Sequence, residues 1–169
     1  MTSHINQYDP VNRPSHYIGT NGLECKDIVR KLVFDFVGYD ASSYAQAIQY
    51  ILRAPRKNGI EDLKKARFYI EEVLKSKDCM SDGECLYLRR YSDERDTCIS
   101  IPARAGIIAR LVGDAYDGFK KDSDSEYNYY FKNIVAEMFV FSVFHRMDSL
   151  QSMKNNIEML ISYCEGGTK

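Results

Sequence analysis

Hydrophobic residues recur at helical spacing along most of this chain, which predicts a mainly α-helical fold, a compact helical bundle. The second helix should begin at a cap made by Asp40 or Ser42 and end at Ala54, because the residue before Pro55 disfavours helical geometry. The other expected helices cover residues 23–37, 60–77, 103–116, 126–146 and 148–164.

The second helix has two chemically different faces. Its apolar face should pack in the core and carries Tyr44, Ile48, Ile51 and Leu52. Its polar face can contact a ligand and carries Gln46, Gln49, Tyr50 and Arg53. The helix is therefore the first candidate for a binding surface.

The segment 126–146 is apolar around most of its circumference, which predicts a helix buried on several sides or a subunit interface. It is too short to cross a membrane and carries Glu137, so we expect no membrane partner. A dense apolar segment in a small chain also predicts a homo-oligomer.

A polar stretch divides the chain into a region 1–77 and a region 78–169, which share one core or form the oligomer interface. A short β-hairpin is plausible near residues 86–101.

Composition narrows the class of protein. The 169 residues carry a net charge of -1, which gives no general attraction to nucleic acid, and none is expected as a partner. Five cysteines without disulfide spacing, and an N-terminus without a signal-peptide pattern, indicate a cytoplasmic protein with free thiols. A zinc site on Cys79, Cys85 and Cys98 is the weaker alternative, because no paired spacing supports it.

Positive charge is concentrated between Arg53 and Arg67, where six basic and two acidic residues leave an excess of four positive charges. Arg53 and Arg56 flank a proline turn just before a helix N-terminus, and both the guanidinium groups and the helix dipole favour phosphate. Lys57 and Lys65 extend the same surface. A solvated helix face is the alternative explanation.

Four further residues complete the candidate site. Arg13, His16 and Tyr17 lie in the loop before the first helix and could bind phosphate, carry a proton or stack on a base. Asp62 could hold Mg²⁺ on a nucleotide, since Mg²⁺ takes one or two carboxylates together with substrate phosphates. First-turn carboxylates such as Asp62 also stabilise a helix N-terminus, and that simpler role is favoured by spacing alone. No P-loop or other standard nucleotide-binding motif is present.

Three blocks of sequence between residues 12 and 74 resemble the small domain of a phage nucleotide kinase family that lacks a P-loop. The blocks contain Pro14, His16 and Tyr17; Tyr50, Arg53, Ala54 and Lys57; and Asp62, Leu63, Lys65, Ala66 and Tyr69. The chain departs from that pattern at Ala45, Gln46 and Gln49, where the family has Gly, Asn and Lys. Loss of the lysine removes a cation that would stabilise a transferring phosphoryl group.

The resemblance implies a nucleotide-binding protein, most simply a nucleoside monophosphate kinase that uses Mg²⁺. Its catalytic residues would be Arg53, Asp62 and His16. Its nucleotide-binding residues would be Arg13, His16, Tyr17, Gln46, Gln49, Tyr50, Arg53, Arg56, Lys57 and Lys65. The alternative is a protein without turnover that sequesters a cyclic or modified signalling nucleotide and so blocks host defence. A third interpretation is an interaction protein that docks through its Phe-rich helix.

Overall fold

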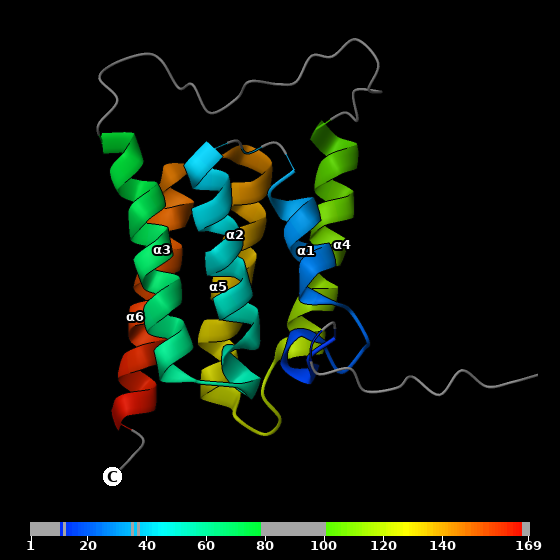
Figure 1. Cartoon of the computed structure of the whole chain (residues 1–169), viewed down its shortest axis with the longest axis vertical. Coiled ribbons are helices and arrows are strands. Elements are labelled where there is room, and N and C mark those ends of the chain that lie inside the picture. The colour runs from blue at the N-terminus through cyan, green and yellow to red at the C-terminus, as the bar shows by residue number, and fades with distance from the viewer. Residues whose placement is uncertain (1–10, 12, 35, 37, 79–100, 167–169) are drawn as a thin grey trace, which may run out of the picture.

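The computed structural model describes residues 11–78, apart from 12, 35 and 37, and residues 101–166. Within these ranges, six α-helices run roughly along one axis (Figure 1): α1 (Cys25–Leu32), α2 (Gly38–Arg53), α3 (Ile60–Asp78), α4 (Ile101–Phe119), α5 (Ser125–Phe144) and α6 (Met147–Gly166). Two short 3₁₀ turns, η1 (Ser15–Tyr17) and η2 (Ala54–Arg56), join them. The predicted mainly α, compact helical bundle is confirmed. In these residues the only β pairing is one isolated bridge between Ile18 and Glu24, and the hairpin expected near 86–101 lies almost wholly outside the described chain.

The α2–α3 hairpin forms one side of the bundle. α2 ends at Arg53, and η2 carries Pro55, so the helix stops where the proline geometry predicts. Gly59 then adopts φ +49, a left-handed conformation that glycine takes at little cost, and the chain reverses into α3. This turn sets Arg53 at the end of one helix opposite the first turn of the next.

α5 lies at the centre of the fold, between α2, α4 and α6 (Figure 1). The side chain of Asp124 caps its N-terminus by accepting a hydrogen bond from the Tyr127 amide at 2.9 Å. Its buried residues point to several sides, and the Tyr44 hydroxyl of α2 donates to the Met138 carbonyl at 3.2 Å. The prediction of a helix buried on several sides is confirmed.

The boundaries of the first two helices differ from the predicted ones. The first helix ends at Leu32 instead of residue 37, and the chain then turns so that Phe36 packs against Tyr44 and Phe141, with ring centroids 5.2 and 5.3 Å apart. Neither Asp40 nor Ser42 caps the second helix, because it already begins at Gly38. Phe36 lies between the two helices and is buried, so the break between them comes earlier in the chain than the polar residues after Val37 suggested.

The fourth helix continues to Phe119, beyond the predicted end at residue 116. Phe119 has no exposed surface, so the helix extends past Asp117 and Gly118 to bury it. A single cluster of buried side chains includes residues from both expected regions, 1–77 and 78–169. In the part of the chain that the structure describes, no helix is long and apolar enough to cross a membrane.

Candidate functional site

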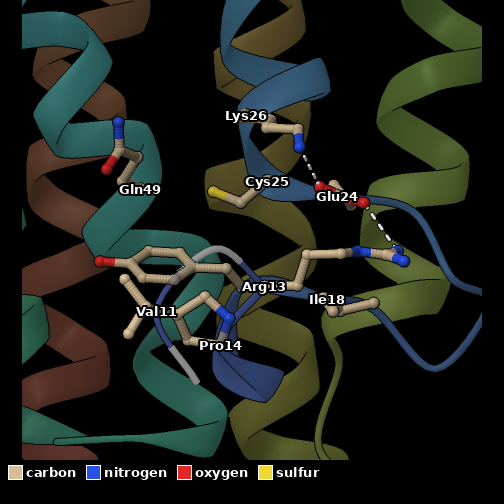
Figure 2. A pocket seen from close by; sticks show the side chains of 9 residues that line it. Val11, Arg13, Pro14, Ile18, Glu24, Cys25, Lys26 and Gln49 are labelled. Carbon is tan, nitrogen blue, oxygen red and sulfur yellow. Dashed lines mark ion pairs between the residues drawn. The ribbon is translucent and has the colours of Figure 1, made fainter. Parts of the chain in front are cut away.

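A pocket of about 310 Å³ opens between η1, the start of α1 and the last turns of α2 (Figure 2). Its walls are partly apolar and partly polar: Val11, Arg13, Pro14, Tyr17, Ile18, Glu24, Cys25, Lys26 and Gln49. This combination of apolar walls with a few polar side chains is typical of small-molecule sites, which range from about 300 to 1,000 Å³.

Three of the predicted nucleotide-binding residues meet in this pocket: Arg13, Tyr17 and Gln49. The amide of Gln49 makes no hydrogen bond to any described residue, so its donor and its acceptor are available to a ligand. Gln46, one helical turn earlier, is half-buried and does not line the pocket.

The charged end of the pocket is formed by Glu24 and two cations. Arg13 and Lys26 contact its two carboxylate oxygens at 2.7 and 2.6 Å. The hydrogen bond from Lys26 and the charge of Arg13 outweigh burial and hold the pKa of Glu24 below its usual range. Arg13 and Lys26 therefore share one carboxylate of the pocket wall.

The Cys25 thiol lies in the pocket wall and is almost completely buried. Burial raises its pKa to about 12, with the charge of Arg53 acting in the opposite direction. The side chain is therefore a neutral thiol that packs as a small apolar group. Cys79, Cys85 and Cys98 lie outside the described residues.

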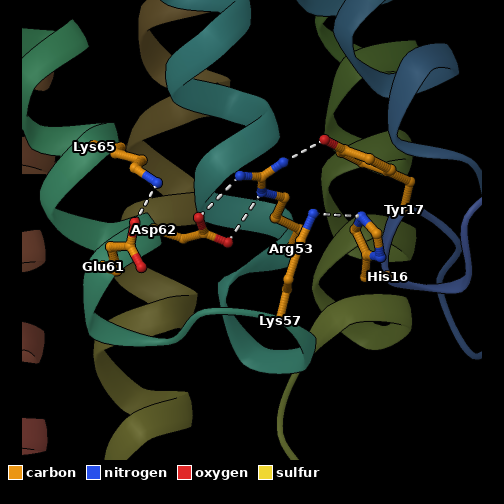
Figure 3. A network of polar contacts seen from close by, with 7 residues as sticks. All are labelled: His16, Tyr17, Arg53, Lys57, Glu61, Asp62 and Lys65. Carbon is orange, nitrogen blue, oxygen red and sulfur yellow. Dashed lines mark hydrogen bonds and ion pairs between the residues drawn. The ribbon is translucent and has the colours of Figure 1, made fainter.

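Behind Tyr17 lies a polar cluster (Figure 3), made up of His16, Tyr17, Arg53, Lys57, Glu61, Asp62 and Lys65. At its centre Arg53 donates to both oxygens of Asp62, each at 3.0 Å, and its third nitrogen donates to the Tyr17 hydroxyl. The side chain of Asp62 has no exposed surface and that of Arg53 is 11% exposed. Arg53 and Asp62 thus form a nearly buried, two-pronged ion pair.

Aromatic rings surround this ion pair. The Arg53 guanidinium carbon lies 4.4 Å from the centroid of the Tyr50 ring, and Tyr50 in turn stacks on Tyr69 at 5.8 Å. Burial lowers the pKa of Arg53, but the hydrogen bonds and charges of Asp62 and Tyr17 outweigh it and the pKa rises. Tyr50 therefore supports Arg53 from one side while Tyr17 accepts from it on the other.

His16 and Lys57 form the exposed edge of the cluster, with Lys57 Nζ 3.2 Å from His16 Nε2. An ammonium group can only donate, so Nε2 accepts and the neutral imidazole carries its proton on Nδ1. Burial, then the charges of Lys57 and Arg53, lower the pKa of His16, while Asp62 acts against them. Lys65, on the opposite side of Asp62, pairs with Glu61.

Arg56 belongs neither to the pocket wall nor to the polar cluster, although the sequence predicted that it binds phosphate. Its guanidinium donates to the carbonyl oxygens of Ile18 and Gly118 and lies 5.3 Å from the centroid of the Phe119 ring. Thr20 and Asn21 also donate to backbone carbonyl oxygens of α4, at Gly118 and Asp114 respectively. Arg56 thus ties the loop after η1 to the C-terminal end of α4.

Sequence reasoning missed Lys26 and Glu24. Both stand at the start of α1, close in sequence to Arg13 and Tyr17, and that proximity was the available signal. Asp62 as a metal ligand stays a prediction, and in this structure both of its oxygens accept from Arg53. Among residues 11–78 and 101–166, no group of three or more His, Cys, Asp or Glu side chains could hold a metal ion.

Residues 11–71 match one family model, DUF3310, a family of proteins of unknown function. Comparison with curated proteins and with solved structures gives no match. The resemblance to a phage nucleotide kinase domain is therefore wrong, because the family found over nearly the same residues carries no kinase assignment. The three blocks of sequence have a structural explanation instead. Arg53 of the second block donates hydrogen bonds to Tyr17 of the first block and to Asp62 of the third.

Proposed function

We propose that this chain binds a nucleotide in the pocket between η1, α1 and α2. The observation that carries the proposal is the pocket itself, where Tyr17 offers a ring, Gln49 offers an unpaired amide and Arg13 and Lys26 offer positive charge. A planar base can pack against the ring and pair with the amide, while an anionic group is attracted to the cations.

Anionic parts of the ligand have a second place to bind, at the exposed pair His16 and Lys57. No ion pair to a carboxylate involves either side chain in the described part of the chain. The N-terminus of α3 is a poorer choice than the sequence suggested, since its first turn already holds Glu61 and Asp62.

Binding without turnover fits this arrangement better than phosphoryl transfer. A kinase of the expected kind needs Arg53 for the phosphates and Asp62 for Mg²⁺. Here the two side chains neutralise each other, and Asp62 has no exposed surface from which to reach a metal. Retention of an intact nucleotide would lower its free concentration, which is how a signalling nucleotide would be sequestered.

The test is a panel of nucleotides incubated with the protein, with and without ATP and Mg²⁺, followed by chromatography of the free and released ligand. The proposal predicts that one nucleotide is depleted and is recovered intact after denaturation. New diphosphate would show phosphoryl transfer instead, and no depletion of any nucleotide would refute the proposal.

A matched pair of variants locates the binding. Tyr17→Leu removes the ring in the pocket wall and should weaken depletion, whereas Tyr39→Leu removes an exposed ring at the opposite end of α2 and should not. Equal effects of the two substitutions would place the ligand elsewhere.

A further inference from the structure

The contact between His16 and Lys57 brings two basic groups together at the edge of the polar cluster (Figure 3). Their nitrogen atoms lie 3.2 Å apart. Most other lysines for which a side-chain contact is described face a carboxylate; Lys26, Lys64 and Lys75 are examples. The His16–Lys57 contact therefore exists only while the imidazole is neutral, since two cations would repel each other at this distance.

We propose that His16 and Lys57 form an oxyanion site that takes up one proton from solvent when the anion binds. This inference deepens the proposed function and rests on it only for the identity of the natural ligand. The ligand chemistry is a phosphate-type oxyanion, either free or as part of a nucleotide.

The charges around the imidazole explain why the proton arrives together with the anion. Lys57 and Arg53 oppose protonation of His16, and Asp62 favours it, although Asp62 is already paired with Arg53. Tyr17 packs on the imidazole, with ring centroids 4.5 Å apart. An oxyanion between the two nitrogens would cancel the repulsion from Lys57.

The hydrogen bonds change with the charge. In the free protein Lys57 donates to Nε2 of His16, so this nitrogen has no hydrogen to offer. An anion that accepts from Lys57 needs a second donor, and protonation of Nε2 supplies one while Nδ1 keeps its hydrogen. The proton comes from solvent, the hydrogen bond between Lys57 and His16 is replaced by hydrogen bonds to the anion, and no other covalent bond forms or breaks.

Sulfate is the sharpest probe, because its charge stays constant near neutral pH and any proton uptake belongs to the protein. Calorimetric titrations in two buffers of different ionisation enthalpy count the protons taken up. The inference predicts uptake that approaches one proton, and affinity that rises by at most about tenfold per pH unit as pH falls from about 8 to about 6.

Two variants and one control assign the effect. His16→Gln keeps a donor and an acceptor but cannot titrate, so proton uptake should vanish. Lys57→Gln should weaken sulfate binding, whereas Lys31→Gln, the same change on an exposed lysine of α1, should leave it unchanged. Sulfate binding with no proton uptake, or uptake that survives in His16→Gln, would overturn the inference.

Inorganic phosphate and the nucleotides are then titrated in the same way, which separates the two proposals. If sulfate binds without proton uptake while a nucleotide still binds, the oxyanion site is refuted and nucleotide binding is left intact. Proton-coupled binding of sulfate and phosphate, with no nucleotide bound, refutes the proposed function and keeps the oxyanion site.

Discussion

At the C-terminal end of α2 a buried carboxylate is fully paired, whereas at its N-terminal end two buried oxygen atoms have no hydrogen-bond partner among the described residues. Asp62 and Arg53 satisfy each other through two hydrogen bonds of 3.0 Å. Asp40 and Ser43 are 4% and 1% exposed, yet Asp40 Oδ2 and Ser43 Oγ make no hydrogen bond to any residue that the structure describes. Unpaired buried polar atoms cost stability, so the two ends of one helix contribute very differently to the fold.

This contrast bears on function because the paired end is also the end that carries the pocket. The Arg53–Asp62 pair holds Tyr17 through its hydroxyl, and Tyr17 forms part of the pocket wall. A residue that resembles a phosphate clamp in the sequence therefore acts first as a support for the site.

The largest effect should come from Arg53→Ala, which leaves the buried Asp62 carboxylate without its partner. Breaking a buried ion pair from one side costs about 3–5 kcal/mol of unfolding free energy, and denaturant titration measures it. The control is Arg30→Ala, which removes an exposed arginine 3.8 Å from Asp27 and should cost less than about 1 kcal/mol. Similar losses for the two variants would contradict a structural role for Arg53.

Replacing both partners sharpens the same comparison. Arg53→Met combined with Asp62→Leu removes the two paired charges together, although the Tyr17 hydroxyl still loses its donor, so it should recover much of the stability lost in Arg53→Ala. A double variant no more stable than Arg53→Ala would show that Arg53 acts through contacts other than Asp62.

Arg56→Ala should have the next largest effect, because it removes the donors that reach Ile18 and Gly118. Loss of charged hydrogen bonds to two carbonyls predicts a decrease of roughly 2 kcal/mol in unfolding free energy. Arg56→Lys keeps the charge but not the two-pronged geometry, so its unfolding free energy should lie between that of the unchanged protein and that of Arg56→Ala. A loss below about 0.5 kcal/mol in Arg56→Ala would show that Arg56 does not hold the loop to α4.

Ser43→Ala tests the unpaired end of α2 and should be neutral or stabilise the fold by up to about 1 kcal/mol, because no hydrogen bond is lost. Ser142→Ala is the matched comparison: its hydroxyl lies 3.1 Å from that of Tyr44, and its loss should cost about 1 kcal/mol. Thermal or denaturant unfolding of both variants decides the point, and an equal cost would show that Ser43 has a partner.

The smallest effect is a pH dependence from His16. Its pKa in the folded protein lies below the unfolded value of about 6.5, so the unfolded chain binds the proton more readily. Stability should therefore decrease as pH falls through about 6.5 towards the lower folded pKa. His16→Gln should remove this part of the pH dependence, and an unchanged pH profile of unfolding would refute it.

Sequence periodicity was enough to predict the helices, since α3, α5 and α6 each carry apolar residues at helical spacing. The boundaries failed where a tertiary contact decides them, as at Phe36 and Phe119, whose burial no local pattern encodes. Periodicity also separated the two faces of α2 and so found Gln49 and Arg53.

The candidate site was predicted in composition but not in pairing. Tyr17, Arg53 and Asp62 were expected to face a ligand, and the structure turns them towards one another instead. The spacing of residues from different elements does not show which charges will neutralise each other. For the same reason Gln46 and Gln49 looked equivalent in sequence, although only Gln49 reaches the pocket.

That difference provides the most direct test of nucleotide binding in the pocket. Equilibrium dialysis with the nucleotide found in the panel would compare Gln49→Ala with Gln46→Ala, the same substitution one turn apart on α2. The account predicts that Gln49→Ala weakens binding by about 2- to 10-fold, the worth of one hydrogen bond, and that Gln46→Ala leaves it unchanged. Equal affinities in the two variants would contradict it.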